Sequence, residues 1–531
     1  MRITILGGGP SGLYFAILMK KLDSGHEITI VERDGPNDTF GWGIVFSGRI
    51  MSILRERDPE SHAEIMRASQ TWESADTVHK SVRVSMHGNT FSGIARITFL
   101  NTLQQRCRDL GVLLKHHSNV TAVASMRDCD LLVGADGANS LVRQTYDMFF
   151  QPLIDLRQNR FTWLGTQQSF SGLTMIFRTV RMPNGEDGLF IAHAYHFSPT
   201  TSTFIVECPP RTWLYAGLDR MSEAETLAYL AEVFRDDLGG HALLSNNFLR
   251  WRNFPLIKNK HWYHENVVLL GDALHTAHFS IGSGTRLALE DSMALADAFA
   301  SHPPLATPMR MSGQRIAPAL ADFEHTRKPR VDEFQEAATT SLAWLENVQE
   351  HLHLDPVPFA FGLMTRSGRQ GYHRIKRKDP EFIAHYDAWK LSQRPEGPIP
   401  DQFLELFKKR SFGHLATLMV DGTPHVTPVW VDYDGQHVIV NSAKGRLKDI
   451  AMSKRPKVAI EIGDPDNPNR YVLVRGEVVE ITEEGADAHL DKLAQRYLSR
   501  EAYPPSWRFP GEVRRIYKVL PTHVTPWEPF G

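Results

Sequence analysis

The sequence lacks most of the features that mark secreted, membrane-bound and nucleic-acid-binding proteins. It has three cysteines in 531 residues, Cys107, Cys129 and Cys208, a scattered and odd-numbered set that fits neither a disulfide framework nor a zinc site. No apolar run approaches the roughly 20 residues that a membrane-spanning helix needs. The formal net charge is −2, so no excess of positive charge favours a nucleic-acid partner. We therefore expect a cytoplasmic protein without a metal site, a membrane anchor or bound nucleic acid.

The beginning and the length of the chain set two further expectations. Met1 is followed at once by an apolar, strand-like run, which leaves no room for a signal peptide. A chain of 531 residues is too long for one ordinary core, so we expect two or three domains. The composition, with 42% hydrophobic and 23% charged residues, is typical of globular proteins.

A glycine-rich turn near the N-terminus lies between two apolar runs. The first run, at 2–6, ends at Gly7, and the second occupies 13–19 after Gly9 and Gly12. Gly7 permits a tight turn, Gly9 lets the backbone approach a pyrophosphate, and Gly12 lets a helix and a strand pack closely. The N-terminus of the helix supplies free N–H groups for phosphates. The pattern therefore predicts a strand, a phosphate-binding turn and a helix.

A second strand-like run, at 27–31, ends at an acid, Glu32. The acid follows the last glycine by about twenty residues, the spacing expected for a carboxylate that binds a ribose hydroxyl. Ser11, in the turn, and Arg33, beside the acid, complete this group of predicted cofactor residues. The alternative is a glycine-rich turn that binds nothing, which the full strand, turn, helix, strand and acid context disfavours. By itself this motif does not separate FAD from NAD.

Two more turns follow apolar, strand-like runs later in the chain. Residues 130–133 lead into Gly134-Ala135-Asp136-Gly137, and residues 267–270 lead into Gly271-Asp272. A third stretch then begins a predicted helix with Gly282, Gly284 and Thr285.

In this order and at this spacing, the motifs resemble the signature of single-component flavoprotein aromatic monooxygenases, which share the p-hydroxybenzoate hydroxylase fold. The resemblance implies FAD as cofactor, NADH or NADPH as reductant and oxygen as co-substrate. It implies that Asp136 lies near the flavin and the passing nicotinamide, and that Asp272 holds a ribityl hydroxyl of FAD. It also implies that the helix beginning near Gly284 directs its amides at the flavin ring. Arg96 matches a family position near the FAD.

Residues 38–47 and 275–284 narrow the resemblance to the branch of salicylyl-CoA hydroxylase and anthraniloyl-CoA monooxygenase, although Phe279 stands where the family often has proline. This branch implies an aromatic acyl-CoA substrate. An acid–base group is then needed to deprotonate the substrate's hydroxyl or amine and so enrich the ring. His275 and His278 are the predicted catalytic residues, and either would equally suit a buried, backbone-bonded role.

The phosphates of CoA require cations. The candidates in this sequence are Arg157, Arg160, Arg366, Arg369, Arg374, Lys376, Arg377 and Lys378. For the run at 374–378, a solvated surface is the alternative interpretation.

The chain divides into two predicted domains of different character. Residues 1–390 are expected to hold an α/β, Rossmann-like FAD-binding domain with a β-sheet substrate domain, whose strands show as period-two alternation between 161 and 254. Residues 391–400, rich in proline and glycine, are the predicted linker. Residues 401–531 are predicted to form a small split β-barrel, because short alternating runs flank Asp-Gly turns at 421–422 and 434–435.

The C-terminal segment resembles the split-barrel flavin-binding family related to pyridoxamine phosphate oxidase, and most closely its deazaflavin branch. The resemblance rests on residues 427–430, 443–448 and 455–459. It implies that FMN or 8-hydroxy-5-deazaflavin binds here, with its phosphate on Lys444, Arg446 and Lys448. We also expect a homodimer. The alternative is a barrel that serves only dimerisation.

Together these motifs predict an FAD-dependent monooxygenase that hydroxylates an aromatic acyl-CoA and carries a fused, reductase-like domain. Two other hypotheses remain open. One is a monooxygenase of a free aromatic natural product, such as an indole or a polyketide. The other is a flavin-binding protein whose barrel only dimerises.

Overall fold

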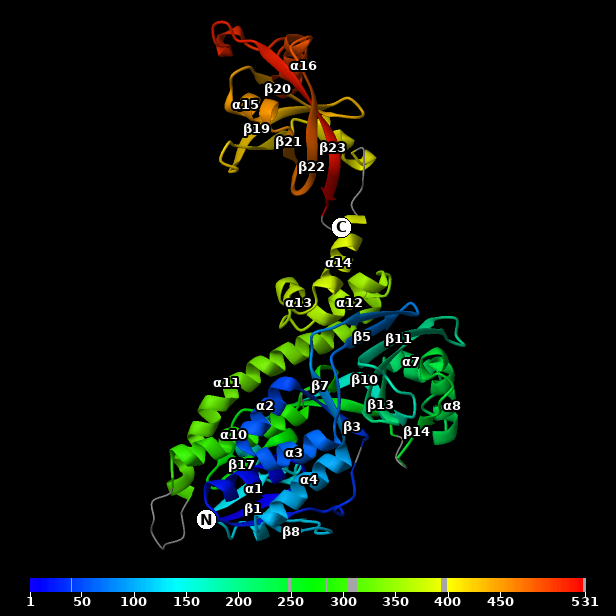
Figure 1. The fold of residues 1–531 in the computed structure, drawn as a ribbon, viewed down its shortest axis with the longest axis vertical. Coiled ribbons are helices and arrows are strands. Elements are labelled where there is room, and N and C mark those ends of the chain that lie inside the picture. The colour runs from blue at the N-terminus through cyan, green and yellow to red at the C-terminus, as the bar shows by residue number, and fades with distance from the viewer. Residues whose placement is uncertain (40, 247–249, 283, 304–312, 393–398, 529–531) are drawn as a thin grey trace. The chain divides into compact units, whose positions relative to one another are not determined.

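The computed structural model describes residues 1–39, 41–246, 250–282, 284–303, 313–392 and 399–528. The chain forms two compact units, Met1–Tyr386 and Asp387–Gly531 (Figure 1). Most of the predicted linker, residues 391–400, lies outside the described residues. None of the described helices is long and apolar enough to cross a membrane.

The first unit contains a six-stranded sheet that brings the three sequence motifs to one edge. β1 pairs in parallel with β2 and with β9, and β9 pairs in parallel with β17. The last residue of β1, Leu6, and Leu269 of β17 both lie opposite Gly134 of β9. Because parallel strands end at the same edge, the segments that follow them meet there. The strands, in sheet order, are β16 (Tyr263–His264), β17 (Val267–Leu269), β9 (Leu131–Gly134), β1 (Arg2–Leu6), β2 (Glu27–Val31) and β8 (Leu113–Lys115).

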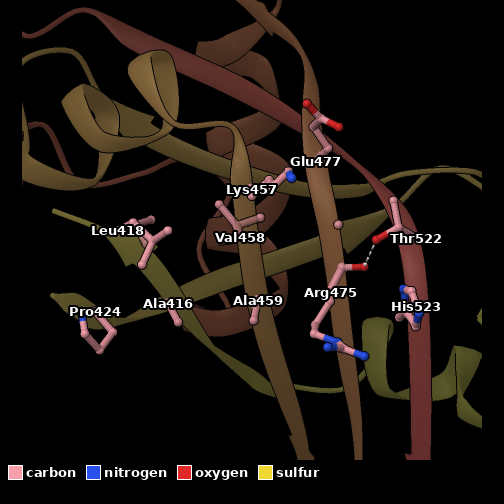
Figure 2. A pocket seen from close by; sticks show the side chains of 12 residues that line it. Ala416, Leu418, Pro424, Lys457, Val458, Ala459, Arg475, Glu477, Thr522 and His523 are labelled. Carbon is pink, nitrogen blue, oxygen red and sulfur yellow. Dashed lines mark hydrogen bonds between the residues drawn. The ribbon is translucent and has the colours of Figure 1, made fainter. Parts of the chain in front are cut away.

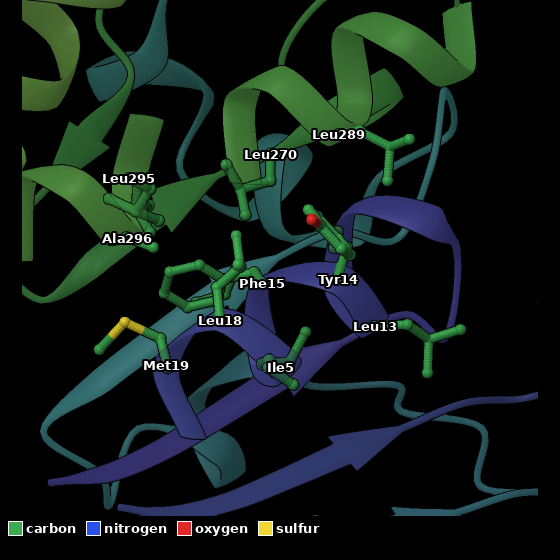
Figure 3. Packing of buried hydrophobic residues seen from close by; sticks show 14 of the residues in the cluster. Ile5, Leu13, Tyr14, Phe15, Leu18, Met19, Leu270, Leu289, Leu295 and Ala296 are labelled. Atoms are coloured by element: carbon green, nitrogen blue, oxygen red, sulfur yellow. The ribbon is translucent and has the colours of Figure 1, made fainter. Parts of the chain in front are cut away.

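Helix α1 (Pro10–Leu22) covers this sheet together with α10 (Gly284–Ser301). Figure 3 shows Phe15 and Leu18 of α1 in one buried cluster with Leu295 and Ala296 of α10. Each fully buried aromatic or leucine side chain contributes about 1.5–3 kcal/mol. The Oγ of Ser292 donates to the carbonyl of Ser11 at 2.8 Å, which ties α10 to the first turn of α1.

A second, eight-stranded sheet confirms the predicted β-sheet domain. It follows the order β14 (Leu243–Leu244), β10 (Pro152–Thr166), β13 (Thr201–Cys208), β12 (Asp187–Ser198), β11 (Leu173–Arg181), β5 (Ala75–His79) and β6 (Val82–Met86), with β15 (Arg252–Asn259) also paired to β10. A small sheet of β3 (Gly43–Ser47), β7 (Phe91–Ala95) and β4 (Gln70–Trp72) lies in the same unit.

Helices complete the first unit. The long α11 (Gly313–Glu346) packs along α10, and α12 (Pro356–Thr365) and α13 (Tyr372–Lys378) follow it. The boundary between the two units falls within the next helix, α14 (Pro380–Ser392). The other α-helices are α2 (Gly48–Arg57), α3 (Pro59–Ala68), α4 (Arg96–Asp109), α5 (Leu141–Thr145), α6 (Asp147–Phe150), α7 (Pro210–Tyr215), α8 (Glu223–Val233) and α9 (Arg235–Leu238).

The second unit contains a closed antiparallel barrel, which confirms the predicted C-terminal β-barrel. Its strands, in order, are β18 (Phe412–Leu418), β19 (Pro424–Tyr433), β20 (Val438–Ala443), β23 (Arg514–Trp527), β22 (Asn467–Thr482) and β21 (Lys457–Asp464). Inward-facing residues such as Leu415, Val431 and Val474 fill its core. Gly422 and Gly435, in the two predicted turns, have φ of 81° and 99°, which glycine adopts most easily. The helices α15 (Leu447–Lys454) and α16 (Ala486–Leu498) belong to this unit.

Candidate active site

The glycine-rich turn is built so that only one of its glycines faces open space. Gly7 has φ of 106°, and a Cβ there would lie 2.2 Å from the carbonyl oxygen of Ala135. A Cβ on Gly12 would lie 2.4 Å from the carbonyl oxygen of Gly7. A Cβ on Gly9, the residue that precedes α1, would meet nothing within 4 Å. The helix N-terminus therefore has free N–H groups and an unfilled space in front of it, as a pyrophosphate requires.

Glu32 lies at the end of β2, as the sequence predicts, and it also holds the turn in shape. Its Oε2 accepts a hydrogen bond from the N–H of Gly8 at 2.6 Å, and its Oε1 accepts one from the N–H of Asp34 at 2.9 Å. Arg33 is largely exposed and pairs with Asp34 at 3.3 Å. A ribose contact remains a prediction for both Glu32 and Arg33.

A deep cavity of about 280 Å³ lies where the three motifs meet. The predicted cofactor residues that line it are Gly9, Ser11, Arg96, Asp272, Gly282, Gly284 and Thr285. The carboxylate of Asp136 is turned away, because it accepts hydrogen bonds from Leu141 and Val142 at the start of α5, at 2.7 and 3.2 Å. Burial raises the pKa of Asp136. Its neighbours Ala135 and Gly137 line the cavity in its place.

Arg96 and Asp272 give the cavity one charge of each sign. Burial lowers the pKa of the Arg96 guanidinium, and the charge of Asp272 partly opposes this shift. Burial raises the pKa of the Asp272 carboxyl, and the charge of Arg96 partly opposes that shift. The Nε of Arg96 donates to Oγ1 of Thr39 at 3.1 Å. Among the described residues no hydrogen bond reaches the Asp272 carboxylate, which faces the cavity and is free to accept a ribityl hydroxyl. With the open space at Gly9, these contacts fit FAD.

The two histidines predicted as catalytic do not line the deep cavity. The Nε2 of His275 lies 2.9 Å from Oδ2 of Asp291, and Oδ1 of Asp291 accepts from Nε of Arg327 at 2.8 Å. The Nδ1 of His278 accepts from the N–H of Ser280 at 3.3 Å. Burial lowers the pKa of His278 to about 4, so its imidazole is uncharged near neutral pH. A catalytic role for either residue remains a prediction.

The cavity wall includes a histidine that the sequence analysis missed. His193, on β12, lines the cavity, and its Nε2 lies 3.3 Å from Oε2 of the buried Glu207 on β13. Other side chains that line the cavity include Trp163, Tyr195, Ile205, Phe254 and Phe279. The sequence feature that could have indicated this pair is the presence of His193 and Glu207 within strand-like runs of mostly apolar or small residues.

A second cavity of about 630 Å³ adjoins the first. The two share five lining residues: Val45, Leu173, Met175, Ser280 and Gly282. The second cavity is also lined by six cations: Arg49, Arg286, Arg366, Arg369, Arg374 and Lys378. Of the CoA candidates, Arg157, Arg160, Lys376 and Arg377 are not among its lining residues.

These cations differ in how firmly they are held. Arg366 donates to Oγ of Ser341 and to the carbonyl of Ser280, both at 2.8 Å, and burial lowers its pKa to about 10. Arg369 and Arg374 are exposed, and no ion pair joins either of them to an acid among the described residues. Exposed cations without acidic partners are available to a phosphate.

In the barrel, two of the predicted phosphate ligands lie close to a third cation. Burial lowers the pKa of Lys448, and the charges of Arg446 and Arg514 lower it further. Arg446 also lies 3.7 Å from the buried Glu512, and Lys444 pairs with Glu483 at 3.1 Å. The structure thus brings Arg446 and Lys448 together near Arg514, the first residue of β23.

The barrel also has a groove of about 570 Å³, lined mainly by residues of β18, β21, β22 and β23. Figure 2 shows Lys457, Arg475 and His523 along it, beside the apolar Leu418 and Val458. The three predicted phosphate ligands, Lys444, Arg446 and Lys448, are not among its lining residues.

Comparison with known proteins shows that each unit is similar to a known protein family. Residues 1–337 match the family model described as FAD binding domain, and residues 399–524 match that of pyridoxamine 5'-phosphate oxidase. The chain is 35% identical over 413 residues to salicyloyl-CoA 5-hydroxylase from Streptomyces sp, covering 76% of each protein. It is 36% identical over 351 residues to 3-hydroxy-4-methyl-anthranilyl-[aryl-carrier protein] 5-monooxygenase from Streptosporangium sibiricum, covering 66% of this chain and 90% of that protein.

A solved structure shows the same fold. The tetrameric form of 2-methyl-3-hydroxypyridine-5-carboxylic acid oxygenase aligns with a TM-score of 0.51 at 18% identity, covering 69% of this chain and 95% of that one.

Proposed function

Because this chain belongs to the FAD-binding domain family and is an FAD-dependent monooxygenase, we propose that it hydroxylates an aromatic ring carried as a thioester of coenzyme A. The reductant is NADH or NADPH and the oxidant is oxygen. FAD, when bound, supplies the oxygen-activating chemistry. The protein holds the cofactor and the ring and keeps water away from them.

The residues around the deep cavity divide this work. The N-terminus of α1, behind Gly9, would hold the pyrophosphate, and the Asp272 carboxylate would accept a ribityl hydroxyl. Trp163, Ile205 and Phe254 supply a largely apolar wall against which an aromatic ring can pack. This wall also excludes water from the reacting atoms.

The observation that carries the CoA proposal is the adjoining cationic cavity. A ring in the deep cavity would place its thioester near the shared residues, such as Leu173 and Met175. The coenzyme A part of the substrate would then extend past Phe334 towards Arg369, Arg374 and Lys378. Phosphates bind such groups by charge-assisted hydrogen bonds. A free aromatic acid has only its carboxylate to pair with a cation and lacks the phosphates that could reach Arg369, Arg374 and Lys378.

A substrate panel tests the proposal. The full-length, FAD-loaded protein is incubated with NADH or NADPH and with salicyloyl-CoA, anthraniloyl-CoA or the two free acids. We expect a CoA thioester to accelerate oxidation of the nicotinamide by at least about tenfold and to gain one oxygen atom, since substrate binding energy positions the ring for reaction. Equal acceleration of nicotinamide oxidation by the free acids, or hydroxylated product formed only from the free acids, would contradict the proposal.

We further propose that the barrel binds the phosphate of FMN or 8-hydroxy-5-deazaflavin through Arg446 and Lys448. The proximity of these residues and Arg514 supports it, because three neighbouring cations repel one another unless an anion lies between them. Glu512 neutralises part of this charge.

Charge removal tests the barrel site. In the full-length protein with FAD bound, Arg446→Ala with Lys448→Ala is expected to weaken binding of either coenzyme by about tenfold or more, as loss of charge-assisted hydrogen bonds does. Fluorescence titration measures this, with Lys457→Ala, in the separate groove, as the matched control. If neither coenzyme binds the wild type, the proposal that the barrel binds a flavin or deazaflavin is wrong. Sedimentation of the same samples then tests whether the protein forms the expected homodimer.

A further inference from the structure

His193, in the wall of the deep cavity, forms a polar pair with the buried Glu207. β12 and β13 are antiparallel neighbours in which His193 lies opposite Ile205 and Ile191 lies opposite Glu207. His193 and Glu207 are therefore diagonal partners on the same face of the sheet. Their side chains meet with Nε2 of His193 3.3 Å from Oε2 of Glu207. The residues are 5% and 0% exposed, so both are shielded from bulk solvent.

The alternation of the two strands places this pair on the cavity face. Phe190, Ala192 and Ala194 of β12 pack in the apolar core on the other side of the sheet. Phe204, Val206 and Cys208 of β13 pack in the same core. His193, Tyr195 and Ile205 lie between these positions and line the deep cavity. The histidine of the pair therefore faces the space in which a substrate ring would bind.

Glu207 is held as a carboxylate. Burial acts to raise its pKa, but the hydrogen bonds from His193 and Asn159 oppose burial, and the pKa is lowered. The Nδ2 of Asn159 donates to Oε1 at 2.8 Å. An ionised carboxylate only accepts hydrogen bonds. The Nε2 of His193 must therefore carry the proton that is donated to Oε2.

This arrangement fixes the tautomer of His193. With the proton on Nε2, the Nδ1 atom of the neutral ring has a lone pair and can accept a proton. Among the described residues no hydrogen bond reaches Nδ1 of His193. Phe279 lies edge-on to the ring, with centroids 5.2 Å apart, and leaves it without a competing polar neighbour on that side.

We propose that Nδ1 of His193 accepts the proton from a hydroxyl group on the aromatic ring of the substrate, and that Glu207 is its positioning residue. The proton passes from the substrate oxygen to Nδ1, giving an imidazolium beside the Glu207 carboxylate and an electron-rich ring. The same proton returns to the substrate heteroatom when the ring becomes aromatic again, so no proton is gained or lost in this exchange. Oxygen transfer to a ring is faster when the ring is electron-rich.

Other titratable groups face this pair. His278, in the loop before η3 (Phe279–Ile281), couples to both His193 and Glu207, and its lowered pKa keeps it neutral. Arg366, after α12, and Arg157, on β10, bring positive charge to the same region. The uncharged His278 does not compete with His193 for the carboxylate's negative charge near neutral pH. The exchange therefore depends on His193 and Glu207.

Three variants test the proposal in the FAD-loaded, full-length protein. His193→Asn removes the proton acceptor and is expected to lower kcat about 100-fold with salicyloyl-CoA, the usual contribution of general base catalysis. Glu207→Gln allows the opposite tautomer and is expected to lower kcat at least about tenfold. His79→Asn removes a buried imidazole that binds the carbonyl of Leu354, outside both cavities, and serves as the matched control.

Two readouts separate proton transfer from a structural role. The acidic limb of the kcat–pH profile should disappear in His193→Asn while FAD binding stays as in the wild type. Bound 4-nitrophenol should show the yellow phenolate spectrum in the wild type and the His79→Asn variant, and the neutral phenol spectrum in His193→Asn and Glu207→Gln. This second measurement needs no CoA thioester, so it tests His193 even if the proposed substrate is wrong.

An unchanged kcat and pH profile in His193→Asn would overturn the proposal. So would a wild type that does not bind 4-nitrophenol or binds it without ionising it. If His193→Asn does not fold, the Glu207→Gln variant decides through the same two measurements.

Discussion

The Gly9→Ala variant is expected to fold like the wild type and to bind FAD at least about tenfold more weakly, which corresponds to about 1.4 kcal/mol. Gly9 has φ of −78°, which alanine adopts without strain, and a Cβ there meets no protein atom within 4 Å. The added methyl group would instead occupy the space in front of α1 where the pyrophosphate belongs. The loss should therefore appear in cofactor affinity and leave the apoprotein's stability unchanged.

Gly12→Ala is the matched variant with the opposite expected result. Its Cβ would lie 2.4 Å from the carbonyl oxygen of Gly7, a backbone atom that cannot move aside without displacing β1. Overpacking of this kind costs about 1–3 kcal/mol or more. Thermal unfolding of the apoproteins and titration with FAD separate the two effects. Equal stability and equal FAD affinity in both variants would show that the turn does not hold the cofactor.

Replacing Arg369, Arg374 and Lys378, three cations that line the second cavity, with glutamine should raise KM for an aromatic CoA thioester by about tenfold or more. The kcat should stay nearly unchanged. Each exposed cation contributes about 0.2–1 kcal/mol to an ion pair, so three together contribute about 0.6–3 kcal/mol, and the middle of that range corresponds to about tenfold or more. The effect should shrink as salt is added, because salt screens exposed charges.

The chain supplies its own control for this experiment. Lys376 and Arg377 lie on α13, as do Arg374 and Lys378, but they are not among the lining residues of the cavity. Replacing both with glutamine removes two positive charges, against three in the test variant, and should leave KM unaffected. The N-acetylcysteamine thioester of the same acid, which has no phosphate, should show no effect in either variant. An equal rise in KM in the control, or with the phosphate-free thioester, would exclude direct phosphate contacts.

The sequence predicts those parts of the site that depend on backbone geometry. The spacing of Gly7, Gly9 and Gly12 reflects a turn in which a side chain at two of the three positions would strike the backbone. The meeting of this turn with the Asp272 loop follows from parallel strands that end at one edge. Both relations are local or follow from a common sheet topology, so motif order is enough to predict them.

The direction of individual side chains depends on contacts that sequence spacing does not specify. His275 and His278 lie beside the flavin-facing loop in sequence, yet His275 turns towards Asp291 on α10 and His278 caps a short 3-10 helix. The contact between His193 and Glu207 requires the exact pairing of β12 with β13. Asp136 likewise turns to the first N–H groups of α5.

The most direct test of the account is the origin of the oxygen atom in the product. The FAD-loaded protein is supplied with NADH, salicyloyl-CoA and oxygen-18 gas, and the CoA thioesters are analysed by mass spectrometry. We predict a hydroxylated thioester that carries one oxygen-18 atom, in an amount that tracks the NADH consumed. Consumption of NADH that yields only hydrogen peroxide with every aromatic thioester, or a product whose new oxygen comes from water, would contradict it.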